Sequence, residues 1–119
     1  MSNFVELCRL DVVPVEGAGI FSVNERSLIV MRLDTQRVQV YLNRCPHLGV
    51  PLNWDDNVLD PDGAFIQCST HGALFERDTG LCVLGPCRDD SLWSIESRIE
   101  GGAVLVDADE LPPAGGGFY

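Results

Sequence analysis

The chain has 119 residues, which is the length of one domain and too short for two full hydrophobic cores. Its eight basic residues are all arginine and face eighteen acidic ones, and the net charge of −10 argues against binding to nucleic acid or to an anionic membrane surface. No stretch reaches the roughly 18 apolar residues of a membrane span, and the first residues lack the basic start of a secretory signal. We therefore expect a cytoplasmic protein with neither nucleic-acid nor membrane partners.

Short apolar runs between turn residues predict an all-β protein, because no segment keeps the 3.6-residue period of a helix for long. A first antiparallel pair is predicted for residues 27–33 and 38–42, which flank a connector at 34–37. A second pair is predicted for 93–99, where apolar and polar residues alternate, and for 103–106. The two hairpins are expected to form a small β scaffold.

Residues 43–92 differ from the scaffold because prolines interleave there with asparagines and aspartates, so that loops predominate. Only short strands are expected, at 65–67 and 73–75. Functional residues commonly reside in such loops when a rigid scaffold carries them. We expect one domain, 1–119, with a scaffold at 1–42 and 93–111, a loop-rich subdomain at 43–92 and a flexible tail at 112–119.

The two histidines of the chain each follow a cysteine within these loops, in Cys45-Pro46-His47 and Cys68-Ser69-Thr70-His71. Thiolate and imidazole ligands suit zinc or an iron–sulfur centre, whereas Mg²⁺ and Ca²⁺ prefer oxygen ligands. Zinc-finger sites pair Cys with Cys and His with His, but here each loop offers one of each. A binuclear iron–sulfur cluster accepts that mixed pairing, and a zinc-stabilised structural module stays as an alternative.

The remaining three cysteines are Cys8, Cys82 and Cys87. We expect them to be small buried or loop thiols, because the four ligand positions are already filled. An odd number of cysteines in a chain without an export signal also argues against a disulfide framework.

The two loops closely resemble the cluster-binding boxes of Rieske [2Fe–2S] proteins. The matching segments are 45–49 (Cys-Pro-His-Leu-Gly) and 68–72 (Cys-Ser-Thr-His-Gly), and Gly85-Pro86 is similar to the third, proline-containing loop of that family. The resemblance implies a fold of three small antiparallel sheets, in which the loop-rich subdomain binds one [2Fe–2S] cluster.

The same resemblance implies roles for individual residues. Cys45 and Cys68 would ligate one iron, and His47 and His71 the other. Further positions are expected to lie around the cluster: Gly49, Gly72, Ala73, Phe75 and Pro86. Among them, the two glycines suit a close approach of the backbone, and the proline would cover the cluster.

The electrostatics of such a cluster set its expected potential. With two histidine ligands the oxidised cluster is formally neutral, which places Rieske potentials at about −150 to +300 mV. In the high-potential respiratory members, a serine and a tyrosine follow the second box, where this chain has Ala73 and Phe75. Hydroxyl donors to sulfur are therefore missing, and a low-potential, ferredoxin-like protein is expected.

The resemblance implies a soluble one-electron carrier between a reductase and an oxygenase or other oxidoreductase, with no catalysis by the chain itself. A small subunit of a larger oxidoreductase, similar to that of assimilatory nitrite reductase, is the alternative. The acidic loop between the boxes, which carries Asp55, Asp56, Asp60 and Asp62, is a candidate docking face for a partner with a basic surface.

Overall fold

The computed structural model describes residues 3–46, 51–53, 57–69 and 72–112. Within them, ten strands form three antiparallel sheets and the only helices are two short 3-10 turns, Leu10–Val12 and Ala108–Glu110. The prediction of an all-β fold with three small antiparallel sheets is therefore confirmed. No helix in this part of the chain has the length and apolar character needed to cross a membrane.

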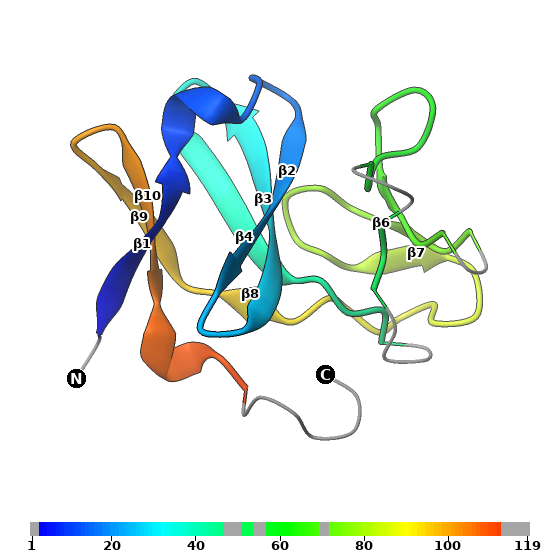
Figure 1. Ribbon diagram of the computed structural model, residues 1–119. Helices are drawn as coiled ribbons and strands as arrows, with labels where there is room; N and C mark the ends of the chain where they lie inside the picture. Colours follow the sequence, from blue (N-terminus) through cyan, green and yellow to red (C-terminus); the bar gives the residue numbers. More distant parts are fainter. Residues whose placement is uncertain (1–2, 47–50, 54–56, 70–71, 113–119) are drawn as a thin grey trace.

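The first sheet has the order β1-β10-β9 and joins the start of the chain to its end (Figure 1). Its strands are β1 (Phe4–Arg9), β9 (Ser97–Glu100) and β10 (Ala103–Asp107). Strands β9 and β10 are joined by Gly101 and Gly102, whose φ angles of 59° and 77° suit a tight hairpin turn. The predicted hairpin of 93–99 with 103–106 is thus confirmed where β9 pairs with β10.

The central sheet has the order β2-β3-β4-β8. It consists of β2 (Ala18–Val23), β3 (Arg26–Asp34), β4 (Arg37–Leu42) and β8 (Ser94–Ile95). The predicted pairing of β3 with β4 is confirmed, but the connector is shorter than 34–37 because Asp34 and Arg37 already pair across the strands. The Asp34 carboxylate accepts a hydrogen bond from the Gln36 N–H at 2.9 Å, which closes the turn.

The predicted single strand at 93–99 is wrong in one respect, because the structure divides it between two sheets. Ser94 and Ile95 pair with β4 in the central sheet, whereas Ser97–Glu100 pairs with β10 in the first sheet. An uninterrupted alternation of apolar and polar residues does not reveal such a change of partner, because both halves bury alternate side chains.

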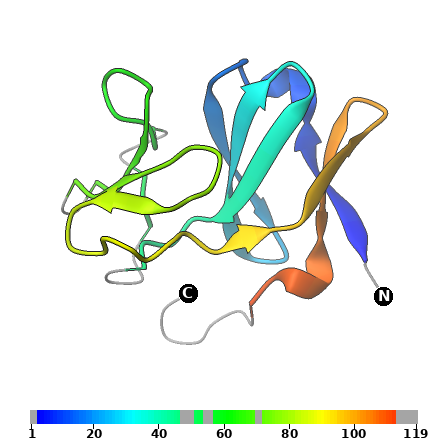
Figure 2. The same cartoon turned by 180° about the vertical axis from the view of Figure 1, so that it is seen from behind.

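The third sheet is the smallest and has the order β5-β6-β7. Strands β5 (Ile66–Gln67) and β6 (Leu74–Phe75) fall within the segments predicted at 65–67 and 73–75. Strand β7 (Cys82–Leu84) was not predicted. This sheet lies on the opposite side of the central sheet from β1, β9 and β10, as the two views in Figures 1 and 2 agree.

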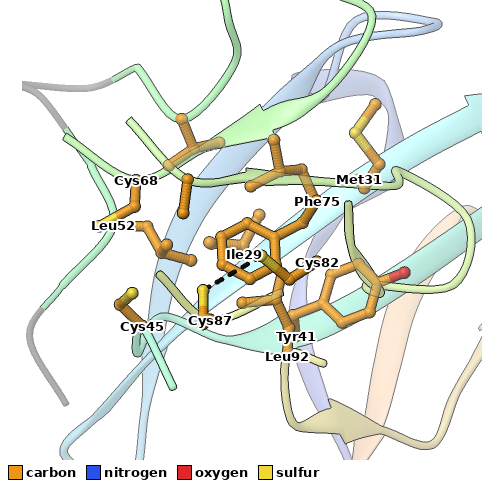
Figure 3. Close-up of a cluster of buried hydrophobic side chains, with 13 residues drawn as sticks. Ile29, Met31, Tyr41, Cys45, Leu52, Cys68, Phe75, Cys82, Cys87 and Leu92 are labelled. Atoms are coloured by element: carbon orange, nitrogen blue, oxygen red, sulfur yellow. Dashed lines mark hydrogen bonds between the residues drawn. The ribbon is translucent and has the colours of Figure 1, made fainter. Parts of the chain in front are cut away.

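The central sheet is buried on both faces, because alternate residues of its strands point to opposite sides. Leu28 and Val30 of β3 belong to a core shared with the first sheet. Ile29 and Met31 of the same strand belong to a second core, which also contains the loop cysteines (Figure 3). The loop-rich region is therefore built directly onto the scaffold through apolar packing.

Tyr41 joins the scaffold to the loops. Its hydroxyl donates a hydrogen bond to the Arg77 carbonyl at 2.9 Å, and its ring packs against Gly80. Burial, with smaller contributions from Asp78 and Glu76, raises the pKa of the Tyr41 phenol above its ordinary value, so the neutral donor form is retained.

Pro112 is the last residue that the structure describes. Pro112, assigned from the sequence to a flexible tail, is buried, and its carbonyl accepts a hydrogen bond from Arg26 Nε at 2.7 Å. Residues 113–119 lie outside the described part of the chain. The division into a scaffold and a subdomain at residues 43–92 stays a prediction.

Candidate metal centre

The first cysteine loop starts from a buried asparagine that directly follows β4. Asn43 is 2% exposed, and its Oδ1 accepts a hydrogen bond from the Leu52 N–H at 2.7 Å. Its Nδ2 donates to Ser27 Oγ at 3.1 Å and to Asn53 Oδ1 at 3.0 Å. These bonds hold both ends of the segment that carries Cys45, which lies two residues beyond Asn43. Asn43 was not predicted from the sequence, where its only signal is a polar amide at the end of an apolar strand.

The second cysteine loop is a tight turn between β5 and β6. The Cys68 N–H donates to the Ala73 carbonyl, and the Gly72 N–H donates to the Cys68 carbonyl, both at 2.9 Å. Gly72 has a φ of 71°, in the left-handed region that favours glycine. This left-handed conformation agrees with the expectation that position 72 needs a glycine.

The structure brings the two loops together. The Ser69 N–H, next to Cys68, donates to the Leu52 carbonyl at 3.0 Å, and Leu52 is also the residue that Asn43 holds. Cys45 and Cys68 belong to the same buried cluster, where they are 2% and 1% exposed (Figure 3). Neither forms a disulfide.

These two thiols fit a soft metal centre. Both cysteines are buried in the same apolar cluster. Thiolates are the ligands that iron–sulfur clusters and zinc prefer. A cavity of ≈ 500 Å³ opens beside the second loop, lined in part by Gln67, Cys68 and Gly72. The remaining predicted positions His47, Gly49 and His71 lie outside the described residues, so the ligand set stays a prediction.

The third loop packs on the second. A Cβ added at Gly85 would lie 2.8 Å from the Ala73 Cα, and Gly85 has a φ of 109°, so only glycine permits this approach. Pro86, which follows, is exposed. The contact places the Gly85-Pro86 segment beside the second cysteine loop, while the role of Pro86 as a cover stays a prediction.

Ala73 and Phe75 are both buried in the cluster that contains Cys45 and Cys68. The Phe75 ring lies near the centre of this cluster in Figure 3. Neither side chain has a hydroxyl, so these two positions offer no hydrogen-bond donor to the sulfur atoms around them. This environment agrees with the expected low potential, which itself stays a prediction.

One close pair of sulfur atoms was not predicted from the sequence. Cys82 Sγ and Cys87 Sγ lie 3.2 Å apart, in the same buried cluster as Cys45. Burial raises the pKa of the Cys87 thiol, and the contacts with Cys82 and Cys45 raise it further. The expectation that Cys8, Cys82 and Cys87 are buried or loop thiols is confirmed, because all three are buried and free. Only the fold shows that Cys82 and Cys87 share a buried cluster with the candidate ligands.

The acidic loop is in part structural. Asp60 Oδ1 accepts hydrogen bonds from the Ala64 and Phe65 N–H groups at 2.8 and 3.0 Å, so this carboxylate closes its own turn. Asp62 is exposed, and Asp55 and Asp56 lie outside the described residues. Docking by this loop stays a prediction.

Comparison with known proteins agrees with the geometry. The model of the Rieske [2Fe-2S] domain family matches residues 3–100. The ferredoxin component of the alkene monooxygenase system from Xanthobacter autotrophicus is 29% identical over 115 residues, which cover 95% of this chain and 88% of that protein.

Solved structures show the same fold. The Sphingomonas yanoikuyae B1 ferredoxin has a TM-score of 0.71 at 27% identity, and the match covers 88% of this chain and 98% of that one. A chain from the complex of reduced oxygenase and oxidised ferredoxin in carbazole 1,9a-dioxygenase has a TM-score of 0.70 at 21% identity, and the match covers 95% of this chain and all of that one.

Proposed function

The chain belongs to the Rieske [2Fe–2S] domain family, and we propose that it is a one-electron carrier which delivers electrons to an oxygenase. The observation that carries the proposal is the meeting of two buried cysteine loops within a chain that this family matches over residues 3–100. The relative from the alkene monooxygenase system is itself a ferredoxin component, which supports the role of carrier over that of catalyst.

We propose that Cys45 and Cys68 ligate one iron, and His47 and His71 the other. When bound, the cluster supplies a one-electron couple. The chain's own residues fix the loops: Asn43 holds the first at both ends, and the Ser69–Leu52 hydrogen bond ties the second to it. Four protein ligands leave no open position for a substrate, so the chain transfers electrons and does not catalyse the oxygenation.

The proposed partners are a reductase as electron donor and an oxygenase as acceptor. The alkene monooxygenase ferredoxin and the ferredoxin–oxygenase complex of carbazole 1,9a-dioxygenase support the oxygenase partner. The net charge of −10 supports a docking face of basic character on the partner, and we propose a cytoplasmic location.

Two measurements test this function. Protein isolated without oxygen is expected to contain about two irons and two acid-labile sulfides per chain, and its dithionite-reduced form to give an EPR spectrum with the low average g value of mixed Cys and His ligation. A colourless protein that contains zinc would contradict the assignment and favour a structural module.

The second measurement reconstitutes electron flow. A reductase, this chain and a terminal oxygenase should together form product, and leaving out this chain should abolish product formation. A complex with another protein that stays intact through purification and high salt would instead favour the small-subunit alternative, because carrier contacts are transient and salt-sensitive.

We further propose a midpoint potential near the lower end of the Rieske range, because neither Ala73 nor Phe75 provides a hydroxyl. Protein-film voltammetry measures it directly. A midpoint above zero would contradict the low-potential assignment while leaving the cluster assignment intact.

A further inference from the structure

Two cysteines on either side of Gly85-Pro86 lie close enough to react with each other. Cys82 in β7 and Cys87 in the following turn are free, and their Sγ atoms are 3.2 Å apart (Figure 3). Backbone hydrogen bonds fix the pair, because the Cys82 N–H donates to the Asp90 carbonyl at 2.8 Å and the Asp90 N–H donates to the Cys87 carbonyl at 2.9 Å. A disulfide places its sulfur atoms about 2.0 Å apart, so the two thiols need to approach by only about 1 Å.

Cys87 lies on a turn whose neighbouring residues face the solvent. Pro86, Arg88 and Asp89 are exposed, whereas the Cys87 side chain between them is buried. Burial raises the pKa of the Cys87 thiol, so in the closed turn the thiol stays protonated and unreactive. Local opening of this surface turn returns the thiol to water and admits a small oxidant. Cys82 is less accessible, because it is buried within a strand that pairs with β6.

We propose that Cys82 and Cys87 form a redox modification site, at which a peroxide converts the two thiols to a disulfide. Hydrogen peroxide transfers one oxygen to the Cys87 sulfur, so that its O–O bond breaks, one water leaves and Cys87 becomes a sulfenic acid. The Cys82 sulfur then attacks the Cys87 sulfur, the S–S bond forms, the S–O bond breaks, and a second water leaves with the Cys82 proton. Two electrons pass from the thiols to the peroxide, and a thiol reductant reverses the bond by exchange. The reaction requires no cluster ligand, so it is independent of the proposed function.

The disulfide closes residues 82–87 into a ring that contains Gly85. Gly85 packs on the second cysteine loop, where an added Cβ would lie 2.8 Å from the Ala73 Cα. A crosslink removes conformations that the open turn can adopt, so oxidation restrains the segment that packs on this loop. The pair therefore couples exposure to peroxide with the rigidity of the chain next to the candidate ligand Cys68.

The test is peroxide treatment of the cluster-loaded protein, followed by acid quenching, alkylation and digestion with trypsin. Cleavage after Arg77 and Arg88 releases residues 78–88, which contain Cys82 and Cys87 and no other cysteine. This peptide should escape alkylation and weigh two hydrogen atoms less than its reduced form, and dithiothreitol should restore both thiols. Cys8, the single cysteine of the opposite core, is the internal control and should be oxidised at least about tenfold more slowly.

Three results of this digestion would overturn the proposal. The first is a peptide 78–88 that is still fully alkylated after peroxide treatment. The second is oxidation of peptide 45–77, which contains Cys45 and Cys68, ahead of peptide 78–88, because the pair would then not be the preferred site. The third is a product that dithiothreitol does not reduce. A wild-type protein without any Rieske EPR signal would instead contradict the proposed function and leave the reaction of the thiol pair standing.

Single serine variants separate a disulfide from the oxidation of one thiol. Cys82→Ser leaves Cys87 without its partner, so its sulfenic acid should persist long enough for a 1,3-diketone reagent to trap it. Cys87→Ser removes the thiol of the exposed turn, and Cys82 should then be trapped several-fold more slowly. Faster trapping at Cys82 would overturn the assigned order of the two steps.

Hydrogen exchange measures the restraint on the turn without any substitution. The Asp90 N–H, which donates to the Cys87 carbonyl, should exchange several-fold more slowly in the oxidised protein than in the reduced protein. The Leu10 N–H, which donates to the Gly102 carbonyl at 2.8 Å, is the matched control on the far side of the scaffold and should not change. Equal exchange at Asp90 in both forms would contradict the restraint.

Discussion

The two faces of the central sheet carry two different cores. The core toward β1, β9 and β10 consists of aliphatic side chains such as Leu28, Val40 and Val104, with Cys8 as its single cysteine. The core toward the loops contains four cysteines together with Tyr41 and Phe75. Because side chains alternate along a strand, one sheet supports both without sharing a side chain between them. The comparison indicates that the first core provides stability and that the second also holds the chemistry.

The largest effect expected from this comparison is the loss of the cluster. Cys45→Ala or Cys68→Ala removes a proposed ligand and should reduce bound iron and sulfide from about one cluster per chain to almost none. Cys8→Ala, in the opposite core, should leave the content unchanged. Iron and sulfide analysis of the three variants checks the difference, and full cluster content in both ligand variants would show that the site lies elsewhere.

Gly80→Ala should weaken the packing between the central sheet and the loop-rich region, because Gly80 contacts the Tyr41 ring. Gly80 has a φ of 76°, and a Cβ there would lie 2.8 Å from the Tyr41 Cε1, so both backbone strain and a clash are expected, at about 1–3 kcal/mol of unfolding free energy. Gly63→Ala is the matched control, because its φ of 71° is similar but no atom lies within 4 Å of the added Cβ. Denaturant unfolding compares them, and equal losses would show that the Tyr41 contact does not matter.

Charge reversal in the acidic loop tests which region docks the partner. Asp55→Lys with Asp56→Lys should slow electron transfer to the oxygenase by about twofold to tenfold at low salt, and the difference should shrink at high salt. Asp11→Lys reverses an exposed charge on the scaffold and should have a smaller effect. Stopped-flow kinetics measure the rates, and equal slowing by both variants would indicate a general charge effect without a docking face.

Adding hydroxyl groups to the second core should raise the midpoint potential. Ala73→Ser and Phe75→Tyr place donors in the buried cluster that contains Cys45 and Cys68, and each is expected to raise the potential by roughly 20–60 mV. Voltammetry of the two variants provides the comparison. A potential that does not rise would show that these side chains do not reach the sulfur atoms of the cluster.

The smallest expected effect is a pH dependence of stability that arises in the first core. Burial, with a smaller contribution from Glu6, raises the pKa of the Cys8 thiol from 9.0 to about 11. The folded chain therefore retains a proton that the unfolded chain loses in this range, so the stabilising contribution is complete below pH 9 and is lost as the pH rises toward 11 and beyond. Cys8→Ala should flatten this decline, and an unchanged slope would assign it to other groups.

Much of the fold was predictable because its signals are local. The hairpin of β3 and β4 follows from two apolar runs around a turn, and the short strands β5 and β6 follow from apolar residues between loop segments. The change of sheet between β8 and β9 was not predictable. It depends on which neighbouring strand is closer, and an alternating pattern contains no information on that.

The sequence by itself determined the candidate ligands of this protein, because the spacing of cysteine and histidine within each loop reflects the chemistry of the cluster and needs no long-range contact. Tertiary structure decided what surrounds them. Asn43 fixes the first loop through Leu52, and Cys82 and Cys87 share a buried cluster with Cys45 from about forty positions further along the chain. Such contacts depend on packing between distant segments, and no local pattern in the sequence encodes them.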